Sequence, residues 1–184
     1  SSASYFFLAA MLTGGRVRVE HIHPRTLQGD IRLLDLLEEL GGTVVRGGNW
    51  IELTGGPLGG GEKFFDLNDM PDMVPTLAVL AARRPGRTII ANVSHLRHKE
   101  SNRLAALATE LQRTGIRARE TEDGLEIEGE TPTGAIIETY NDHRMAMAFA
   151  VLGLVTPGIV IRDRDVVNKS FPTFWQALDG LYRS

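Results

Sequence analysis

The sequence predicts an α/β fold: one domain of three repeated β-α-β-α-β-β units, the first truncated at its N-terminus. Three observations support this prediction. An apolar helical stretch, a glycine and a strand follow one another three times, and the glycines (Gly15, Gly86 and Gly158) are separated by 71 and 72 residues. A second stretch with apolar residues at helical spacing follows each of these strands. A strand-turn-strand pattern then closes the first two copies.

The expected elements follow in order along the chain. The first copy comprises a helix at 5–12, a strand at 15–19, a helix around 33–40, and hairpin strands at 43–46 and 50–53. The second comprises a strand at 63–67, a helix at 74–82, a strand at 86–90, a helix around 104–111, and hairpin strands at 116–120 and 125–128 joined by Asp-Gly. The third comprises a strand at 135–140, a helix at 145–155, a strand at 158–161 and a helix around 174–181.

No linker or low-complexity stretch divides the chain. We therefore expect a single domain over 1–184, with repeat 1 at about 1–60, repeat 2 at about 61–129 and repeat 3 at about 130–184. The first copy lacks its opening strand, and the chain begins without Met in a helical pattern. We expect that it was cut from a longer protein and that a partner domain is absent.

Composition narrows the function classes. A net charge of -3 and a pI of about 6.0 give no reason to expect nucleic-acid binding. The absence of cysteine excludes disulfides and thiolate metal sites and favours the cytoplasm. No apolar run reaches the roughly 18 residues of a membrane span, so no membrane partner is expected.

Two expected helices begin with cationic side chains. Residues 139–148 read Thr-Tyr-Asn-Asp-His-Arg-Met-Ala-Met-Ala, which places Asp142, His143 and Arg144 at the mouth of an apolar helix. A helix start carries partial positive charge, so Arg144 opposes it unless an anion sits there. Lys99 and Arg103 flank another helix start. Together these starts predict a multiply anionic ligand.

Each candidate also has an ordinary structural interpretation. Asp72 and Glu100 are either acids favoured by a helix dipole or acid–base groups at a cleft. Lys99 and Arg103 are either a solvated helix face or anion ligands. Equivalent positions in repeated units tend to share one end of a domain, which suggests that one rim collects the candidate first-turn groups: Asp72, Lys99, Glu100, Arg103, His143, Arg144 and Lys169.

A metal site has weak support. His21 and His23 would lie on one side of a strand, but no third ligand is indicated. The glycine-rich run 55–61 lacks a Walker lysine and does not open a helix, so we interpret it as a loop. We expect neither a metal nor a cofactor.

Four segments carry a resemblance to a known family: Leu-Asn-Asp-Met-Pro-Asp at 67–72, Arg-His-Lys-Glu-Ser-Asn-Arg-Leu at 97–104, Tyr-Asn-Asp-His-Arg-Met-Ala-Met at 140–147 and Asn-Lys-Ser-Phe-Pro at 168–172. They resemble the C-terminal half of the EPSP synthase family of enolpyruvyl transferases. Residues 1–8 and 28–30 also resemble family signatures, so the resemblance covers essentially the whole chain. It implies two similar three-unit domains that close around phosphoenolpyruvate and shikimate 3-phosphate, with the N-terminal domain of the same protein as the missing partner.

The resemblance also implies a role for each candidate residue. Asp72 would accept a proton and contact the shikimate hydroxyls, and Glu100 would donate a proton to the methylene carbon. Lys99 would hold shikimate 3-phosphate. Arg103, Arg144 and Lys169 would bind phosphoenolpyruvate, with His143 beside them. His95 stands where the family often has an asparagine that helps to hold the shikimate substrate, and an imidazole can also donate a hydrogen bond.

Two alternatives share the fold. One is the sister transferase that acts on UDP-N-acetylglucosamine, against which the His143-Arg144 string argues. The other is a non-catalytic binding or structural module. The isolated chain is expected to be catalytically inactive, because the other wall of the site is missing.

Overall fold

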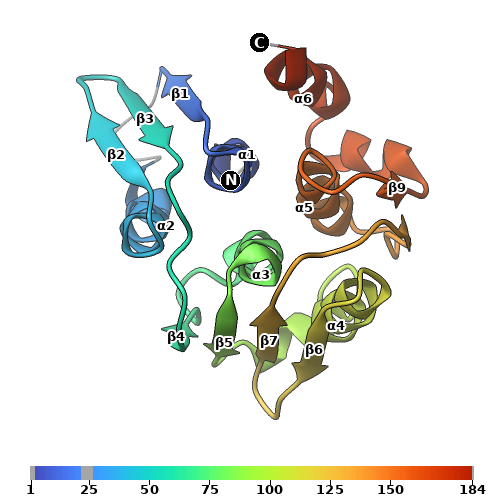
Figure 1. The fold of residues 1–184 in the computed structure, drawn as a ribbon. Coiled ribbons are helices and arrows are strands. Elements are labelled where there is room, and N and C mark those ends of the chain that lie inside the picture. The colour runs from blue at the N-terminus through green and yellow to red at the C-terminus, as the bar shows by residue number, and fades with distance from the viewer. Residues whose placement is uncertain (1–2, 22–26, 184) are drawn as a thin grey trace.

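The computed structural model describes residues 3–21 and 27–183 and confirms the α/β class and the repeated order of elements. Three helices lie at the centre, one from each copy (Figure 1). They are α1 (Ala3–Thr13), α3 (Val74–Arg83) and α5 (His143–Leu152). Each of them contacts the other two, and the remaining elements of the three copies surround this bundle in three groups (Figure 1).

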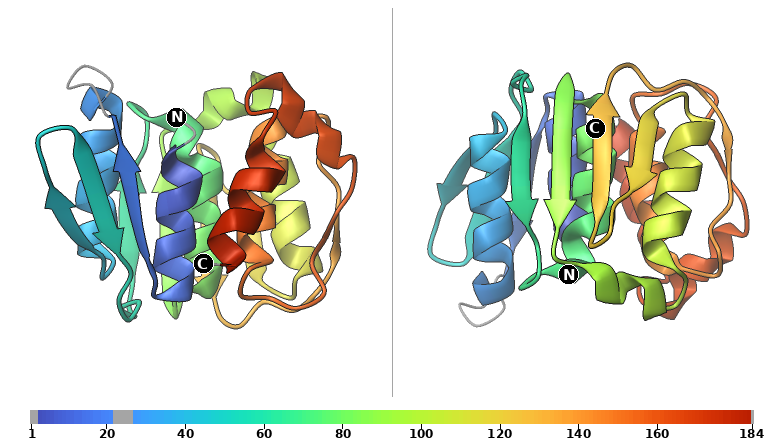
Figure 2. Two further views of the ribbon diagram at one scale, coloured as in Figure 1. Left: turned by 90° about the horizontal axis from the view of Figure 1, so that it is seen from above. Right: turned by 90° about the horizontal axis from the view of Figure 1, so that it is seen from below.

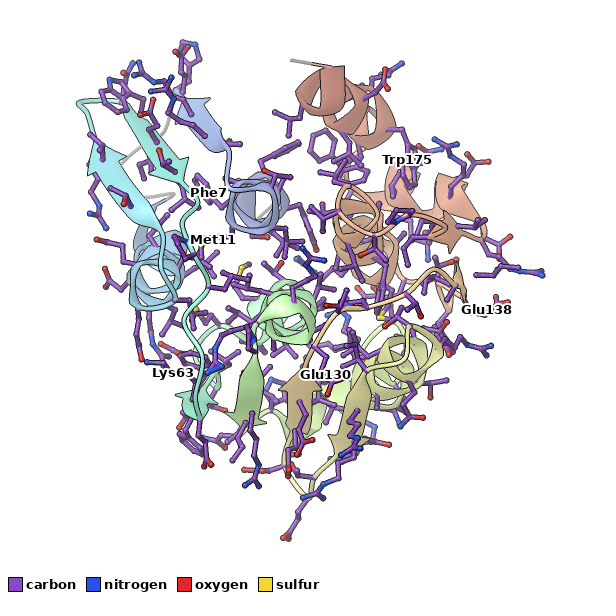
Figure 3. All side chains as sticks on the ribbon, in the orientation of Figure 1. Phe7, Met11, Lys63, Glu130, Glu138 and Trp175 are labelled. Atoms are coloured by element: carbon purple, nitrogen blue, oxygen red, sulfur yellow. The ribbon has the colours of Figure 1, made fainter. Side chains whose placement is uncertain are left out.

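The central helices are apolar on nearly every side, which is the pattern of helices buried in a core. All of α3 from Val74 to Ala82 is buried, and so is α5 from Met145 to Leu152. Side chains fill the space between the helices (Figure 3). The core is therefore a bundle of crossover helices with the sheets outside it.

Within the described residues, three sheets lie around the bundle. The first is antiparallel in the order β1-β3-β2, and the second has the order β4-β5-β7-β6. The third pairs β8 with β9. The strands are β1 (Arg16–Glu20), β2 (Thr43–Arg46), β3 (Trp50–Thr54), β4 (Lys63–Asp66), β5 (Gly86–Ala91), β6 (Arg117–Glu120), β7 (Leu125–Gly129), β8 (Ile136–Ile137) and β9 (Val160–Ile161).

The pairing shows how the copies correspond. The pairs β4–β5 and β8–β9 are parallel, and α3 and α5 are the crossover helices that such pairs require. The hairpin β6–β7 docks antiparallel on β5, as the hairpin β2–β3 docks on β1. In Figure 2 the strands and helices of the copies run roughly along one common direction.

The outer helices are α2 (Leu27–Glu39), α4 (Arg103–Arg113) and α6 (Phe174–Arg183). In α4, Leu104, Leu107 and Leu111 are buried at helical spacing. Asn102 caps this helix by accepting a hydrogen bond from the Ala105 N–H. Three short 3₁₀ helices complete the fold: η1 (Pro71–Met73), η2 (Ser94–His98) and η3 (Arg164–Lys169). No helix in the described ranges is long and apolar enough to cross a membrane.

One expected strand is much shorter than the sequence suggests. The strand expected at 135–140 is reduced to β8 because Tyr140 and Asn141 adopt left-handed backbone angles, with φ of 56° and 57°. The Asp142 N–H donates to the Thr139 carbonyl oxygen at 2.8 Å, which closes a tight turn. The chain therefore turns directly into α5, which begins at His143, two residues earlier than expected.

Candidate active site

The N-terminal ends of the three central helices meet at one end of the bundle. Ser4 Oγ on α1 lies 3.3 Å from Thr76 Oγ1 on α3, although the two residues are 72 positions apart. Asp72, in the η1 turn just before α3, lies 3.5 Å from an Arg144 nitrogen on α5. Each helix start carries partial positive charge, so this end of the bundle favours anions.

Arg103, the first residue of α4, is the centre of the site and is only 1% exposed. Its Nε donates to Asp142 Oδ2 at 2.8 Å, and its Nη2 donates to Asp142 Oδ1 at 3.3 Å. Nη2 also donates to Glu100 at 2.6 Å, and Nη1 donates to Asp72 at 3.3 Å. One buried guanidinium therefore joins three carboxylates from three different segments.

Asp142 is the buried member of these carboxylates, with no exposed surface. It caps α5 by accepting the Arg144 N–H at 3.0 Å, and it accepts the Ser101 hydroxyl at 2.8 Å. Burial alone would raise the pKa of Asp142, but its hydrogen bond to Arg103 and the charge of Arg103 outweigh burial and lower it. Asp142 is thus ionised at neutral pH, and it supplies the anion that the cationic starts of α4 and α5 require.

Asp72 and Glu100 are the accessible carboxylates. Their side chains are 48% and 44% exposed, and both lie against the buried Arg103. Asp72 also faces Arg144, whose side chain is 18% exposed. The arrangement offers two solvent-accessible acids beside two guanidinium groups, which suits proton transfer next to a bound anion.

The other groups on α5 and η3 lie next to this network. Burial, and then the charge of Arg144, lower the pKa of His143, so its imidazole is neutral at pH 7. Among the described residues, His143 Nδ1 is buried without a hydrogen-bond partner. Lys169 donates from Nζ to the Asn141 carbonyl oxygen at 2.7 Å, which places its ammonium beside the turn that leads into α5.

His95 and Lys99 lie outside the network. Both are exposed, and in the part of the chain that the structure describes neither makes a side-chain hydrogen bond or ion pair. The expectation that Lys99 and Glu100 belong to a first helical turn is wrong, because Asn102 is the cap and both residues precede it. Lys169 likewise ends η3 and does not begin a helix.

Sequence reasoning named Asp142 but missed its part in the site. An aspartate before an apolar helix is a recognisable capping signal, whereas its contact with Arg103, 39 positions away, leaves no sequence signal. Tyr5 was missed as well. Its buried hydroxyl has a pKa raised to about 12 by burial, which the charge of Arg144 opposes.

The histidine pair considered for a metal is only partly described. His21 follows the last residue of β1 and has a left-handed φ of 59°, so it is not in the strand, and His23 lies outside the described residues. Within the described ranges, no group of three or more His, Cys, Asp or Glu side chains is placed to hold a metal ion.

The three repeated α/β units, with two acids beside Arg103 and Arg144, agree with the enolpyruvyl transferase class that the sequence resembles. Comparison with known proteins gives the particular family. The EPSP synthase (3-phosphoshikimate 1-carboxyvinyltransferase) family model matches residues 1–178. The chain therefore belongs to the EPSP synthase family, as its four sequence segments suggested.

Individual relatives agree with this assignment. A 3-phosphoshikimate 1-carboxyvinyltransferase of Nostoc sp. is 49% identical over 175 residues, covering 95% of this chain and 41% of the relative. The 3-phosphoshikimate 1-carboxyvinyltransferase of Syntrophobacter fumaroxidans is 50% identical over 186 residues, covering 98% of this chain and 43% of the relative. The structure of EPSP synthase from Acinetobacter baumannii has a TM-score of 0.81 at 33% identity, covering 97% of this chain and 44% of that one. The chain thus spans less than half the length of these relatives.

A second enolpyruvyl transferase shares the architecture. The structure of NikO from Streptomyces tendae has a TM-score of 0.79 at 23% identity and covers 98% of this chain. At this identity the match concerns the fold alone.

Proposed function

We propose that this chain forms one wall of the active site of a 3-phosphoshikimate 1-carboxyvinyltransferase. The complete protein would move the enolpyruvyl group of phosphoenolpyruvate to the 5-hydroxyl of shikimate 3-phosphate and release phosphate through a tetrahedral intermediate. This is a step in the biosynthesis of chorismate and the aromatic amino acids. The observation that carries the proposal is the pair of accessible carboxylates, Asp72 and Glu100, held on the buried Arg103 beside Arg144.

In this proposal the cations bind the anionic substrates. Arg103, Arg144 and Lys169 take the carboxylate and phosphate of phosphoenolpyruvate, with His143 beside them. Lys99 and His95, which are both exposed, take shikimate 3-phosphate. Arginine suits the first task because its planar fork binds an oxyanion at two points.

The accessible acids then move the protons. Asp72 accepts the proton of the 5-hydroxyl while the hydroxyl oxygen attacks the carbon of phosphoenolpyruvate that bears the phosphate group. Glu100 delivers a proton to the methylene carbon, which gives the tetrahedral intermediate. Loss of phosphate and removal of a proton from the new methyl group then regenerate the double bond in the product.

Substrate binding and acid–base chemistry are linked through Arg103. Its Nη1 and Nη2 donate to Asp72 and Glu100. A bound carboxylate or phosphate would compete for these donors, while the bonds to Asp142 keep the guanidinium in place. Binding would therefore free the carboxylate oxygens of Asp72 and Glu100 from Arg103, so that they can exchange protons with the substrates.

The proposal extends to the rest of the protein and its setting. The substrates would be enclosed between this chain and the missing N-terminal domain, which excludes water on closure. The chemistry needs no cofactor. The cytoplasmic location expected from the composition belongs to the same proposal.

Phosphate release by the full-length enzyme tests the function. With phosphoenolpyruvate supplied, shikimate 3-phosphate and UDP-N-acetylglucosamine are offered in turn as acceptors, and the Arg103→Gln variant is the matched control. We expect phosphate release only with shikimate 3-phosphate and only in the unmodified enzyme. Release with the sugar nucleotide instead would support the sister transferase, and release with neither acceptor would support a non-catalytic module.

A further inference from the structure

A second buried carboxylate lies on α4, outside the network around Arg103. Glu110 has no exposed surface. Its Oε2 accepts the Tyr140 hydroxyl at 2.5 Å, and its Oε1 accepts the Glu138 backbone N–H at 2.9 Å. Arg113, which is half exposed, lies 3.1 Å from the same carboxylate. Two of these three partners belong to the segment between β8 and α5.

That segment has an unfavourable backbone conformation. Tyr140 and Asn141 are consecutive non-glycine residues in the left-handed region, with φ of 56° and 57°. Such residues persist only where the surrounding structure holds them. The hydrogen bonds of Glu110 to both sides of Thr139 supply this restraint.

The turn places groups of the candidate site. The Asn141 carbonyl oxygen accepts the Lys169 ammonium, and the next residue, Asp142, caps α5 and holds Arg103. Arg103 and Glu110 are seven residues apart on α4, which puts them on the same helix face. One helix therefore holds both ends of the segment, through Arg103 at Asp142 and through Glu110 at Glu138 and Tyr140.

We propose that Glu110 and Tyr140 are positioning residues for this site. The pair fixes the left-handed turn. This turn places the Asn141 carbonyl oxygen, which accepts Lys169, and Asp142, which caps α5 and binds Arg103. Neither residue touches the substrates. Because this role is expressed through phosphoenolpyruvate binding, it rests on the function proposed above.

Tyr140→Phe in the full-length enzyme tests the pair, because it removes the hydroxyl and keeps the ring. Arg113→Gln is the matched control, since it removes another partner of Glu110 without touching the turn. We expect Tyr140→Phe to raise the KM for phosphoenolpyruvate about five- to twentyfold, with the KM for shikimate 3-phosphate within about twofold. Arg113→Gln should leave both unchanged. A Tyr140→Phe enzyme that behaves like Arg113→Gln would overturn the proposal.

A double-mutant cycle with Glu110→Gln separates positioning from simple stabilisation. If the two side chains act as a pair, the KM increase in the double variant should be clearly smaller than the product of the single effects. Independent effects that multiply would contradict the pairing.

Amide hydrogen exchange gives a readout that does not depend on turnover. Exchange at the Asp142 and Arg144 amides, which donate to Thr139 and to Asp142, should accelerate in Tyr140→Phe and not in Arg113→Gln. Equal exchange rates in the two variants would contradict the proposal that Tyr140 restrains the turn. An unmodified enzyme without activity, together with accelerated exchange in Tyr140→Phe, would refute the proposed function and leave the turn restraint standing.

Discussion

Replacing Asp142 with asparagine tests whether one buried carboxylate holds the site together. Asp142 and Arg103 are 0% and 1% exposed and share two hydrogen bonds. Removing one member of a buried ion pair costs about 3–5 kcal/mol, because the other charge is left without compensation. Here Glu100 and Asp72 still contact the guanidinium, and the asparagine oxygen can still cap α5. We therefore expect a loss of about 2–3 kcal/mol in the free energy of unfolding, at or just below the lower limit of that range.

Thermal and urea unfolding of this chain measure the effect. For a domain of this size, 2–3 kcal/mol corresponds to a fall in Tm of about 5–10 °C. Glu128→Gln is the matched control, because its partner Arg117 is 84% exposed and such surface pairs contribute little. An Asp142→Asn Tm that equals the Glu128→Gln Tm would refute the reasoning.

The pH dependence provides an independent check with a fixed sign. The pKa of Asp142 is lowered in the folded state, despite burial, by its hydrogen bond to Arg103 and the charge of Arg103. A lowered pKa means that the contribution of Asp142 to stability is present above the unfolded value of about 3.9 and is lost as the pH falls through the folded value. The stability difference between the unmodified chain and Asp142→Asn should therefore be largest near neutral pH and shrink below about pH 4. A difference that stays constant into acid would contradict the assignment of the shift.

Three further predictions concern activity. This chain alone should release phosphate from phosphoenolpyruvate and shikimate 3-phosphate at the rate of a blank without protein, because in the proposed function it forms only one wall of the site; clear turnover would contradict this. In the full-length enzyme, Arg144→Lys should raise the KM for phosphoenolpyruvate with little change for the shikimate substrate, and an unaltered KM would remove Arg144 from the binding site. Asp72→Asn and Glu100→Gln should each lower kcat by roughly 10²–10⁴ with little change in Tm, since both acids are about half exposed. Near-normal kcat in either variant would exclude that residue from the proton-transfer groups.

The fold could be predicted from the sequence because its signals are local and repeated. The apolar spacing that predicts α3 and α5 is a property of each helix alone, and the 71- and 72-residue separation of the glycines reveals the copies. The family resemblance was confirmed by the match over residues 1–178. The boundaries were less accurate where the backbone departs from common turn signals. Tyr140-Asn141 is left-handed without a glycine, so nothing marked the early end of β8.

The site was predictable as a set of residues and not as a set of contacts. Cations at two helix starts predicted a multiply anionic ligand, but the sequence could not show that the chain itself supplies carboxylates to one of these cations. In the folded chain, Asp142 meets Arg103 from 39 positions away and neutralises much of its charge. Arg103 is therefore paired within the chain, whereas Lys99 is exposed.

The repeated architecture explains why this charge arrangement needs both the second and the third copy. Each copy contributes one central helix, and the three N-terminal ends meet at one place. Asp72 precedes the second central helix and Asp142 caps the third, while Arg103 comes from the outer helix α4 and reaches both. A cut between the second and third copies would leave Arg103 without its buried partner. The contact between the second and third copies, through Arg103 and Asp142, is thus required to form the site as well as the core.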